Sequence, residues 1–125
     1  MSVASALAEV PGRVESMFLN TDSALNDAGI YAVNLYALGV PHTVIVDDFL
    51  PVTNRYGSYD THFGNVSKDG AMWIHILEKA FAKFHGNYMH IVGGFASNSS
   101  VTVQGGPNKE ISHTTNTKEM NSLWK

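Results

Sequence analysis

Six histidines and one pair of adjacent aspartates are the residues of this chain best suited to chemistry. No histidine stands in the H-E-x-x-H spacing that places two zinc ligands and a general base on one helix. A zinc site assembled from distant histidines stays open as an alternative, and the zinc content of the purified protein would decide it. The histidines are His42, His62, His75, His85, His90 and His113.

The two aspartates, Asp47 and Asp48, stand at the end of a predicted strand. Neighbouring side chains on a strand point to opposite faces, whereas a general acid and a general base must reach the same substrate. The pair therefore favours a structural interpretation: a polar strand end in which one aspartate caps the following turn.

Several kinds of site are excluded by what the chain lacks. It has no cysteine, so it has no disulfide, no thiolate nucleophile and no thiolate metal ligand. It also has no G-x-S-x-G nucleophile elbow and no glycine-rich phosphate loop. The glycine pairs at 93–94 and 105–106 are, taken alone, typical of turns.

Composition indicates a globular protein of one domain or part of one. The chain has 125 residues, of which 44% are hydrophobic and 15% charged. A net charge of -3 without any basic run predicts no nucleic-acid partner. The chain shows no signal peptide and no apolar run of membrane-spanning length, so we expect a cytoplasmic protein without membrane contact.

The segment at 73–94 is the predicted centre of the fold. Apolar residues recur there with the spacing of one helix face, and Gly86 follows as a helix stop. His75 is offset from this face, which predicts a place toward solvent or a second layer. The predicted core residues are Trp73, Ile76, Leu77 and Phe81, joined on the same face by Ala80 and Phe84.

The rest of the chain predicts helices around a short hairpin. Residues 2–9 and 13–19 favour two short helices, and residues 30–38 favour a strand. A break at 39–41 separates that strand from a second one at 43–46, which makes an antiparallel hairpin.

The remaining segments are predicted to be mostly irregular. Residues 53–70 read as a polar loop, with Ser67 or Asp69 available to cap the central helix. Residues 101–103 (VTV) read as a short β segment. A capping box beginning at Asn116 predicts a last helix that reaches Lys125.

Three segments together resemble the catalytic domain of calpains. They are GIYAVNLYALGVPHTVIVDDFLP (29–51), WIHILEKAFAKFHGNYMHIVGG (73–94) and VTVQGG (101–106). Their sequences are most similar to those of calpains from single-celled eukaryotes. The resemblance implies an α+β fold: part of a papain-like cysteine protease, mainly its helical, nucleophile-side lobe, with a short β-hairpin and the central Trp73 helix. It also implies that residues 1–108 form this lobe and that residues 109–125 begin a second one.

The resemblance further implies a calcium-dependent, intracellular cysteine endopeptidase that uses Cys, His and Asn. Residues 4–9 (ASALAE) are similar to the later part of the helix that carries the nucleophile, so the cysteine would precede Met1. The catalytic histidine and asparagine would follow Lys125, and His113, in ISHTT, matches neither setting. The chain is thus expected to be an interior fragment with no catalytic residue of its own and no peptidase activity alone.

Two binding features of calpains map onto this chain with opposite outcomes. Gly94, with Gly93 beside it, matches the glycines whose backbone holds an extended peptide, where a β-carbon would block the approach. A calcium-binding glutamate of the family matches Ala71, which has no carboxylate, and nearby Asp69 is displaced. We therefore expect substrate binding at the glycines and no metal or other cofactor in this chain.

Two interpretations stay open. The chain is either part of a calpain catalytic domain, as a truncated or split product, or a non-catalytic calpain-like module (a pseudoenzyme) with a binding or structural role. The expected partner is a peptide or protein segment in the groove at Gly93 and Gly94, or a second chain that complements this one. Apolar surface left uncovered by missing parts would make the isolated chain marginally stable.

Overall fold

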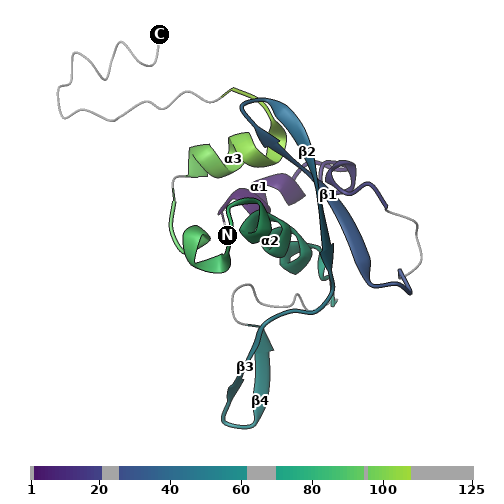
Figure 1. Cartoon of the computed structure of the whole chain (residues 1–125), viewed down its shortest axis with the longest axis vertical. Coiled ribbons are helices and arrows are strands. Elements are labelled where there is room, and N and C mark those ends of the chain that lie inside the picture. Colours follow the sequence, from purple (N-terminus) through teal and green to yellow (C-terminus); the bar gives the residue numbers. More distant parts are fainter. Residues whose placement is uncertain (1, 21–25, 62–69, 95, 108–125) are drawn as a thin grey trace, which may run out of the picture.

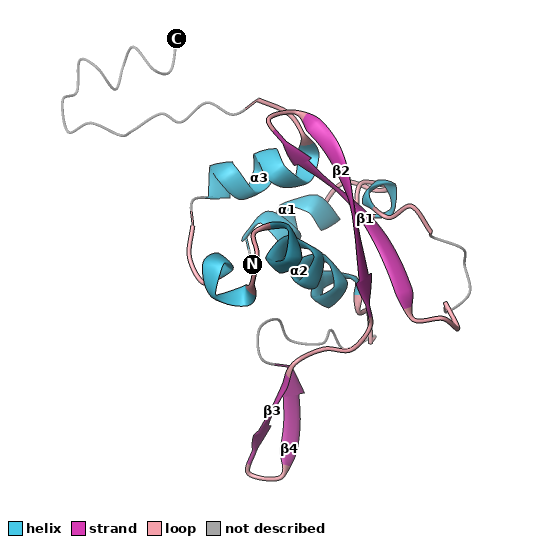
Figure 2. Cartoon of the chain, in the orientation of Figure 1, coloured by secondary structure: helices cyan, strands magenta, loops and turns pink. Residues whose placement is uncertain are grey.

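A computed structural model describes residues 2–20, 26–61, 70–94 and 96–107 of the chain. In this part, three α-helices lie on one side of a β-hairpin, and a second hairpin projects away from them (Figures 1 and 2). The architecture is α+β, as predicted. The helices are α1 (Ser2–Ala8), α2 (Trp73–Phe84) and α3 (Ala96–Gln104), and single 3-10 turns form η1 (Glu15–Met17) and η2 (Tyr88–Ile91).

The first hairpin pairs β1 (Ile30–Ala37) with β2 (Val40–Asp47) in an antiparallel register from Ile30 opposite Asp47 to Ala37 opposite Val40. Leu38 and Gly39 connect them, with φ angles of 51° and 78°. Two consecutive positive φ angles define the tight turn whose twist matches that of paired strands. The predicted break at 39–41 is therefore wrong, because the turn ends at Gly39 and β2 begins at once.

Pro41 is tolerated inside β2 because its backbone nitrogen faces away from β1. In an antiparallel pair, alternate residues turn both backbone groups toward the partner or away from it. Ile45 and Asp47 turn theirs away, since their carbonyl oxygens accept hydrogen bonds from helix lysines. Pro41 shares their parity, so its missing N–H removes no ladder bond.

The hydrophobic core lies between the first hairpin and the three helices. Val33 and Leu35 of β1 are fully buried and meet Leu7 of α1 and Ile76 and Leu77 of α2. Burying each such side chain stabilises the fold by about 1.5–3 kcal/mol. The predicted core is confirmed for Ile76, Leu77 and Ala80, while the larger rings are partly buried and pack around it: Trp73, Phe81 and Phe84.

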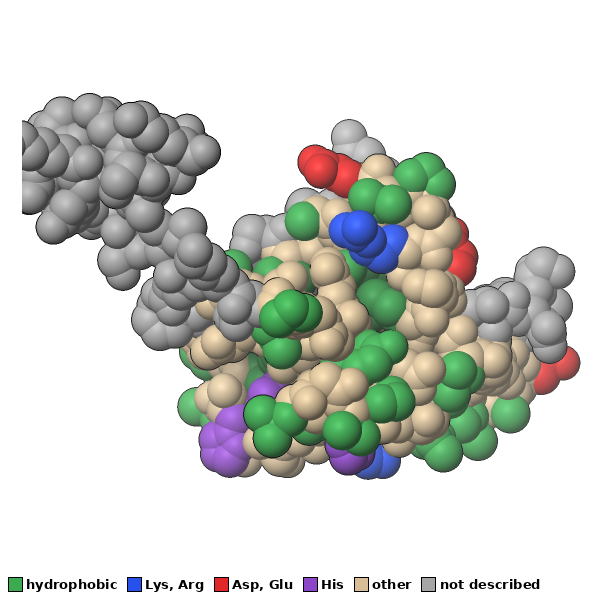
Figure 3. Space-filling model, turned by 90° about the horizontal axis from the view of Figure 1, so that it is seen from above, with side chains coloured by type: hydrophobic (Ala, Val, Ile, Leu, Met, Phe, Trp, Pro, Cys, Tyr) green, Lys and Arg blue, Asp and Glu red, His purple; other side chains and the backbone are tan. Residues whose placement is uncertain are grey.

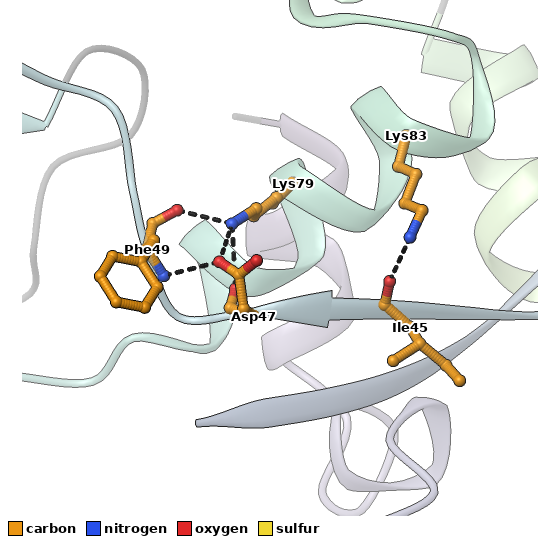
Figure 4. Close-up of polar contacts among 5 residues, drawn as sticks. All are labelled: Ile45, Asp47, Phe49, Lys79 and Lys83. Atoms are coloured by element: carbon orange, nitrogen blue, oxygen red, sulfur yellow. Dashed lines mark hydrogen bonds and ion pairs between the residues drawn. The ribbon is translucent and has the colours of Figure 1, made fainter. Parts of the chain in front are cut away.

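Two lysines of α2 attach the helix to the outer edge of β2 (Figure 4). Lys79 forms an ion pair with the Asp47 carboxylate and donates to the carbonyl oxygens of Asp47 (3.2 Å) and Phe49 (2.6 Å). Lys83 donates to the carbonyl oxygen of Ile45 at 2.7 Å. These contacts occupy acceptors that an edge strand would otherwise offer to another strand.

Asp47 also accepts a hydrogen bond from the N–H of Phe49 at 2.9 Å, and so caps the turn that follows β2. The structural interpretation of the aspartate pair is confirmed. The Asp48 carboxylate points to another place, where it fills the space that a β-carbon on Gly29 would need.

A second hairpin forms in the first part of the loop predicted at 53–70, whose residues 62–69 lie outside the described residues. It pairs β3 (Val52–Arg55) with β4 (Ser58–Thr61) through a turn at Tyr56 and Gly57. None of the described side chains of this hairpin is buried, and Val52, Tyr56 and Tyr59 are exposed. A strand pair without a buried face leaves no alternation of apolar residues, which is why the sequence pattern missed it.

Two further predictions are wrong. Residues 101–103 belong to α3, where Val103 is buried against the core, rather than to a β segment. The helix predicted at 13–19 is reduced to the single turn η1, because the chain then extends and Phe18 bridges to Val33 of β1.

The helix predicted at 2–9 is confirmed as α1. The N-cap position of α2 is Met72, which makes no side-chain cap. The proposed caps Ser67 and Asp69, the last helix from Asn116 and the domain boundary at 108–109 lie outside the described residues. Among the described helices, none is long and apolar enough to cross a bilayer.

Gly105→Ala is expected to destabilise the protein more than Gly12→Ala. Both glycines have positive φ angles, 71° and 77°, which cost an L-residue about 1–2 kcal/mol. A β-carbon on Gly105 would also lie 2.6 Å from the Tyr36 ring, whereas one on Gly12 meets nothing within 4 Å. Urea unfolding of both variants measures the difference, and equal losses would show that the close packing of α3 on the hairpin is unimportant.

Asp47→Asn is expected to lower stability at neutral pH and to have little effect in strong acid. Hydrogen bonds from Lys79 and from the Phe49 N–H lower the pKa of the Asp47 carboxyl from its ordinary value of 3.8. A lowered pKa stabilises the fold above 3.8, and this contribution disappears as pH falls through the pKa of the folded state. Unfolding curves across that pH range check this, with Asp60→Asn on β4 as the control.

Candidate functional site

The candidate site is built where α2 ends and the chain turns toward Gly93 and Gly94. Gly86 adopts a φ of 105° just after α2, which confirms it as the helix stop. Asn87 then caps η2, because its side-chain oxygen accepts the N–H of His90 at 3.1 Å. This cap fixes the direction in which the chain leaves η2 and continues to Gly93 and Gly94.

Gly93 and Gly94 are both exposed and have no positive φ angle. A β-carbon built on either one meets nothing within 4 Å among the described residues. Neither the backbone conformation nor the packing of this part of the chain therefore requires glycine at these positions. The surface beside them is open to another molecule.

Gly94 borders two cavities. The larger, of about 300 Å³, lies between α1, α2 and α3, and its lining is mostly apolar apart from Glu78 and Ser99. Val3 and Ala4 of α1 line this same cavity, so the first turns of α1 and Gly94 face one hollow. The structure therefore brings together two segments: α1, which resembles the later part of the nucleophile helix of calpains, and Gly94, which matches a peptide-holding glycine.

The smaller cavity, of about 230 Å³, also includes Gly93 and lies between the end of α2, η2 and α3. Its walls carry the two histidines His85 and His90, and α3 contributes uncharged polar side chains. Sequence reasoning did not find this cavity because α3 was not expected to be a helix. The polar residues that α3 supplies are Asn98, Ser99 and Thr102.

A still larger hollow, of about 550 Å³, lies between β2 and the last turns of α2. Its two cations, Lys79 and Lys83, already donate to the backbone carbonyl oxygens of Phe49 and Ile45, respectively. Those amines are consequently held in the fold, and Gly93 and Gly94 are not part of this hollow. We therefore take the two cavities at Gly94 as the candidate site.

The histidines do not assemble into a metal centre in the described part of the chain, where no cluster of three or more His, Asp or Glu residues could hold an ion. His75 is buried rather than facing solvent, and its Nε2 lies 3.3 Å from the Thr61 hydroxyl of β4. It helps join α2 to the second hairpin. His42 packs beside Phe84, with ring centres 5.9 Å apart, and His62 and His113 lie outside the described residues.

A family model described as calpain family cysteine protease matches residues 1–125. The calpain-type cysteine protease DEK1 of Zea mays is 32% identical over 111 residues, which are 89% of this chain and 5% of that protein. The calpain-type cysteine protease ADL1 of Oryza sativa matches to the same extent. Calpain-7 of Sus scrofa is 37% identical over 67 residues, or 54% of this chain and 8% of that protein.

The chain therefore belongs to the calpain family of cysteine proteases, as its resemblance implied. It spans only a small part of the length of these relatives. It contains no cysteine, so this polypeptide does not itself encode the nucleophile after which the family is named.

Gly94→Ala is expected to change the free energy of unfolding by less than about 0.5 kcal/mol. The added methyl group meets no described atom, and the backbone is not left-handed there. Thermal or urea unfolding beside the wild-type chain provides the measurement. A large loss of stability would mean that the fold itself, and not a ligand, requires the glycine.

Proposed function

We propose that this chain forms the peptide-holding part of a calpain-type, calcium-dependent cysteine endopeptidase, and that alone it binds peptides without cleaving them. The observation that carries the proposal is the open glycine pair at 93–94, which the surrounding fold does not require. A glycine kept free of side-chain atoms lets the main chain of a ligand come close. An extended peptide can then hydrogen bond to backbone groups while its side chains enter neighbouring pockets.

The position of α1 supports assignment to the nucleophile-side lobe of a papain-like fold. Its residues Val3 and Ala4 share a cavity with Gly94. In such a lobe the reactive group stands beside the edge that holds the peptide, so attack requires both elements around one hollow.

Cleavage by this polypeptide alone is not expected, because its chemistry is incomplete. A cysteine protease requires a thiolate activated by a paired base, and the chain has no thiol. His85 and His90 border the smaller cavity, but each would be a base without a nucleophile to activate. Binding energy alone does not replace the missing bond-forming group.

The residues present also do not fit the calcium site of the family at the matching position. Ala71 offers a methyl group where the resemblance requires a carboxylate. Calcium takes six to eight oxygen ligands, and no acidic cluster of three or more occurs in the described residues. We propose that calcium acts through parts of the protein other than this segment.

A second candidate function is a non-catalytic binding or structural module. The second hairpin favours it, since β3 and β4 project from the body and expose Val52, Tyr56 and Tyr59. Exposed aromatic residues of this kind are enriched at protein interfaces. On this alternative the chain binds a protein through the hairpin and leaves the glycine pair unused.

The test of the proposed function is binding of the peptide acetyl-Ala-Leu-Gln-Ala-amide, followed by NMR. We expect weak, roughly millimolar affinity, with shifts concentrated at residues 93–94, and no hydrolysis with or without calcium. Gly94→Val should abolish the shifts, because its side chain fills the approach to the backbone.

Gly106→Val is the matched control, since Gly106 also has open space and no positive φ angle but lies outside both cavities. Peptide binding that persists in Gly94→Val would refute the proposed role of the glycine pair at 93–94. Turnover of the peptide by the purified chain would refute the proposed lack of catalysis.

A further inference from the structure

The smaller cavity beside the glycine pair joins two histidines with no carboxylate in its lining. Its volume of about 230 Å³ has room for a single side chain but is below the roughly 300–1,000 Å³ of drug-sized ligand sites. Histidine side chains gather along one border of the face shown in Figure 3.

His90 is held so that only one of its ring nitrogens is available. Its Nδ1–H donates to the carbonyl oxygen of His85 at 2.8 Å, and a carbonyl oxygen can only accept. Nδ1 must therefore carry the proton in the neutral ring, and Nε2 can donate only when the ring is a charged imidazolium. An anion beside Nε2 would favour that charged form.

His85 is held in place by aromatic packing. Its ring centre lies 4.4 Å from that of Phe81 and 5.4 Å from that of Phe84, with the second pair edge-on. Such contacts restrict the ring to a small range of orientations. Both histidines are thus positioned before any ligand arrives.

The other elements around the cavity place no charged side chain in its lining. α3 supplies Asn98, Ser99 and Thr102, which are uncharged, and the Thr102 hydroxyl donates to the Asn98 carbonyl oxygen at 3.1 Å. From α2, Glu78 lines the other cavity, and Lys83 donates to β2. Tyr88, the remaining titratable residue of η2, lines the hollow beside β2.

We propose that this cavity receives an acidic side chain, Asp or Glu, of the extended peptide held at Gly93 and Gly94. The inference rests on the proposed function and adds the chemical class of its ligand. Side chains of an extended peptide alternate in direction, so a neighbouring apolar residue is directed to the other, mostly apolar cavity. Binding of the carboxylate is coupled to proton uptake by His90, and affinity for the acidic peptide rises as pH falls.

The experiment compares acetyl-Ala-Leu-Glu-Ala-amide with its Gln counterpart by NMR titration at the two ends of the range in which histidine changes charge, about pH 5 to 8. At the acidic end we expect the Glu peptide to bind about two- to fivefold more tightly, as for a solvent-exposed ion pair. At the basic end the two peptides should bind alike. His90→Gln and His85→Gln should weaken the preference, since glutamine keeps polarity without a charge.

His42→Gln is the matched control, because His42 is also exposed but lies on β2 outside the cavity. Equal binding of both peptides, still abolished by Gly94→Val, would overturn this inference and leave the proposed function standing. A preference for Glu that persists in both histidine variants would also overturn it. Failure of both peptides to bind would overturn the inference together with the peptide-holding role.

Discussion

The structure depends on one interface, the apolar face of α2 against the inner face of the β1–β2 hairpin. Ile76 and Leu77 meet Val33 and Leu35 there, all within the buried core. Apolar burial supplies most of the stabilisation, but it is not directional and would tolerate sliding. The contacts of Lys79 and Lys83 with β2 and Phe49 fix the position of α2 along the strand. Residues 79 and 83 are about 6 Å apart along a helix, close to the separation of about 6.6–6.8 Å between alternate residues of a strand.

That interface also determines where the candidate site forms. Because α2 is fixed on the hairpin, its C-terminal end, the stop at Gly86 and the capped turn η2 have a defined place. The glycine pair then meets α3 and the first turns of α1 around two cavities. The site therefore lies at the border of several elements, and no single element contains it.

Holding a peptide and cleaving it place different requirements on a cysteine protease. Holding a peptide needs an accessible backbone and shaped pockets, and both can be formed by a short chain. Cleaving it needs a thiolate and a base aligned within a fraction of an ångström. On the proposed function, this polypeptide, which has no cysteine, contributes recognition of the peptide and not its cleavage.

Local patterns in the sequence were sufficient for α2, which has a strong apolar period, and for the existence of the first hairpin, although its turn is tighter than predicted. The helix α1 was predicted from its content of good helix formers. The family membership was also predicted from the residues and is confirmed, whereas the peptide-binding role of Gly93 and Gly94 stays a prediction. Tertiary structure decided the rest. Val103 lies in a helix because the core offers it a buried place, and its β-branched neighbourhood favoured a strand only locally. The second hairpin was missed because its strands show no apolar alternation. The positions of His85 and His90 beside α3 were also not predicted, because only the folded chain brings these residues to one cavity. Periodicity reports how one element faces the core, whereas a pocket depends on the relative positions of several elements.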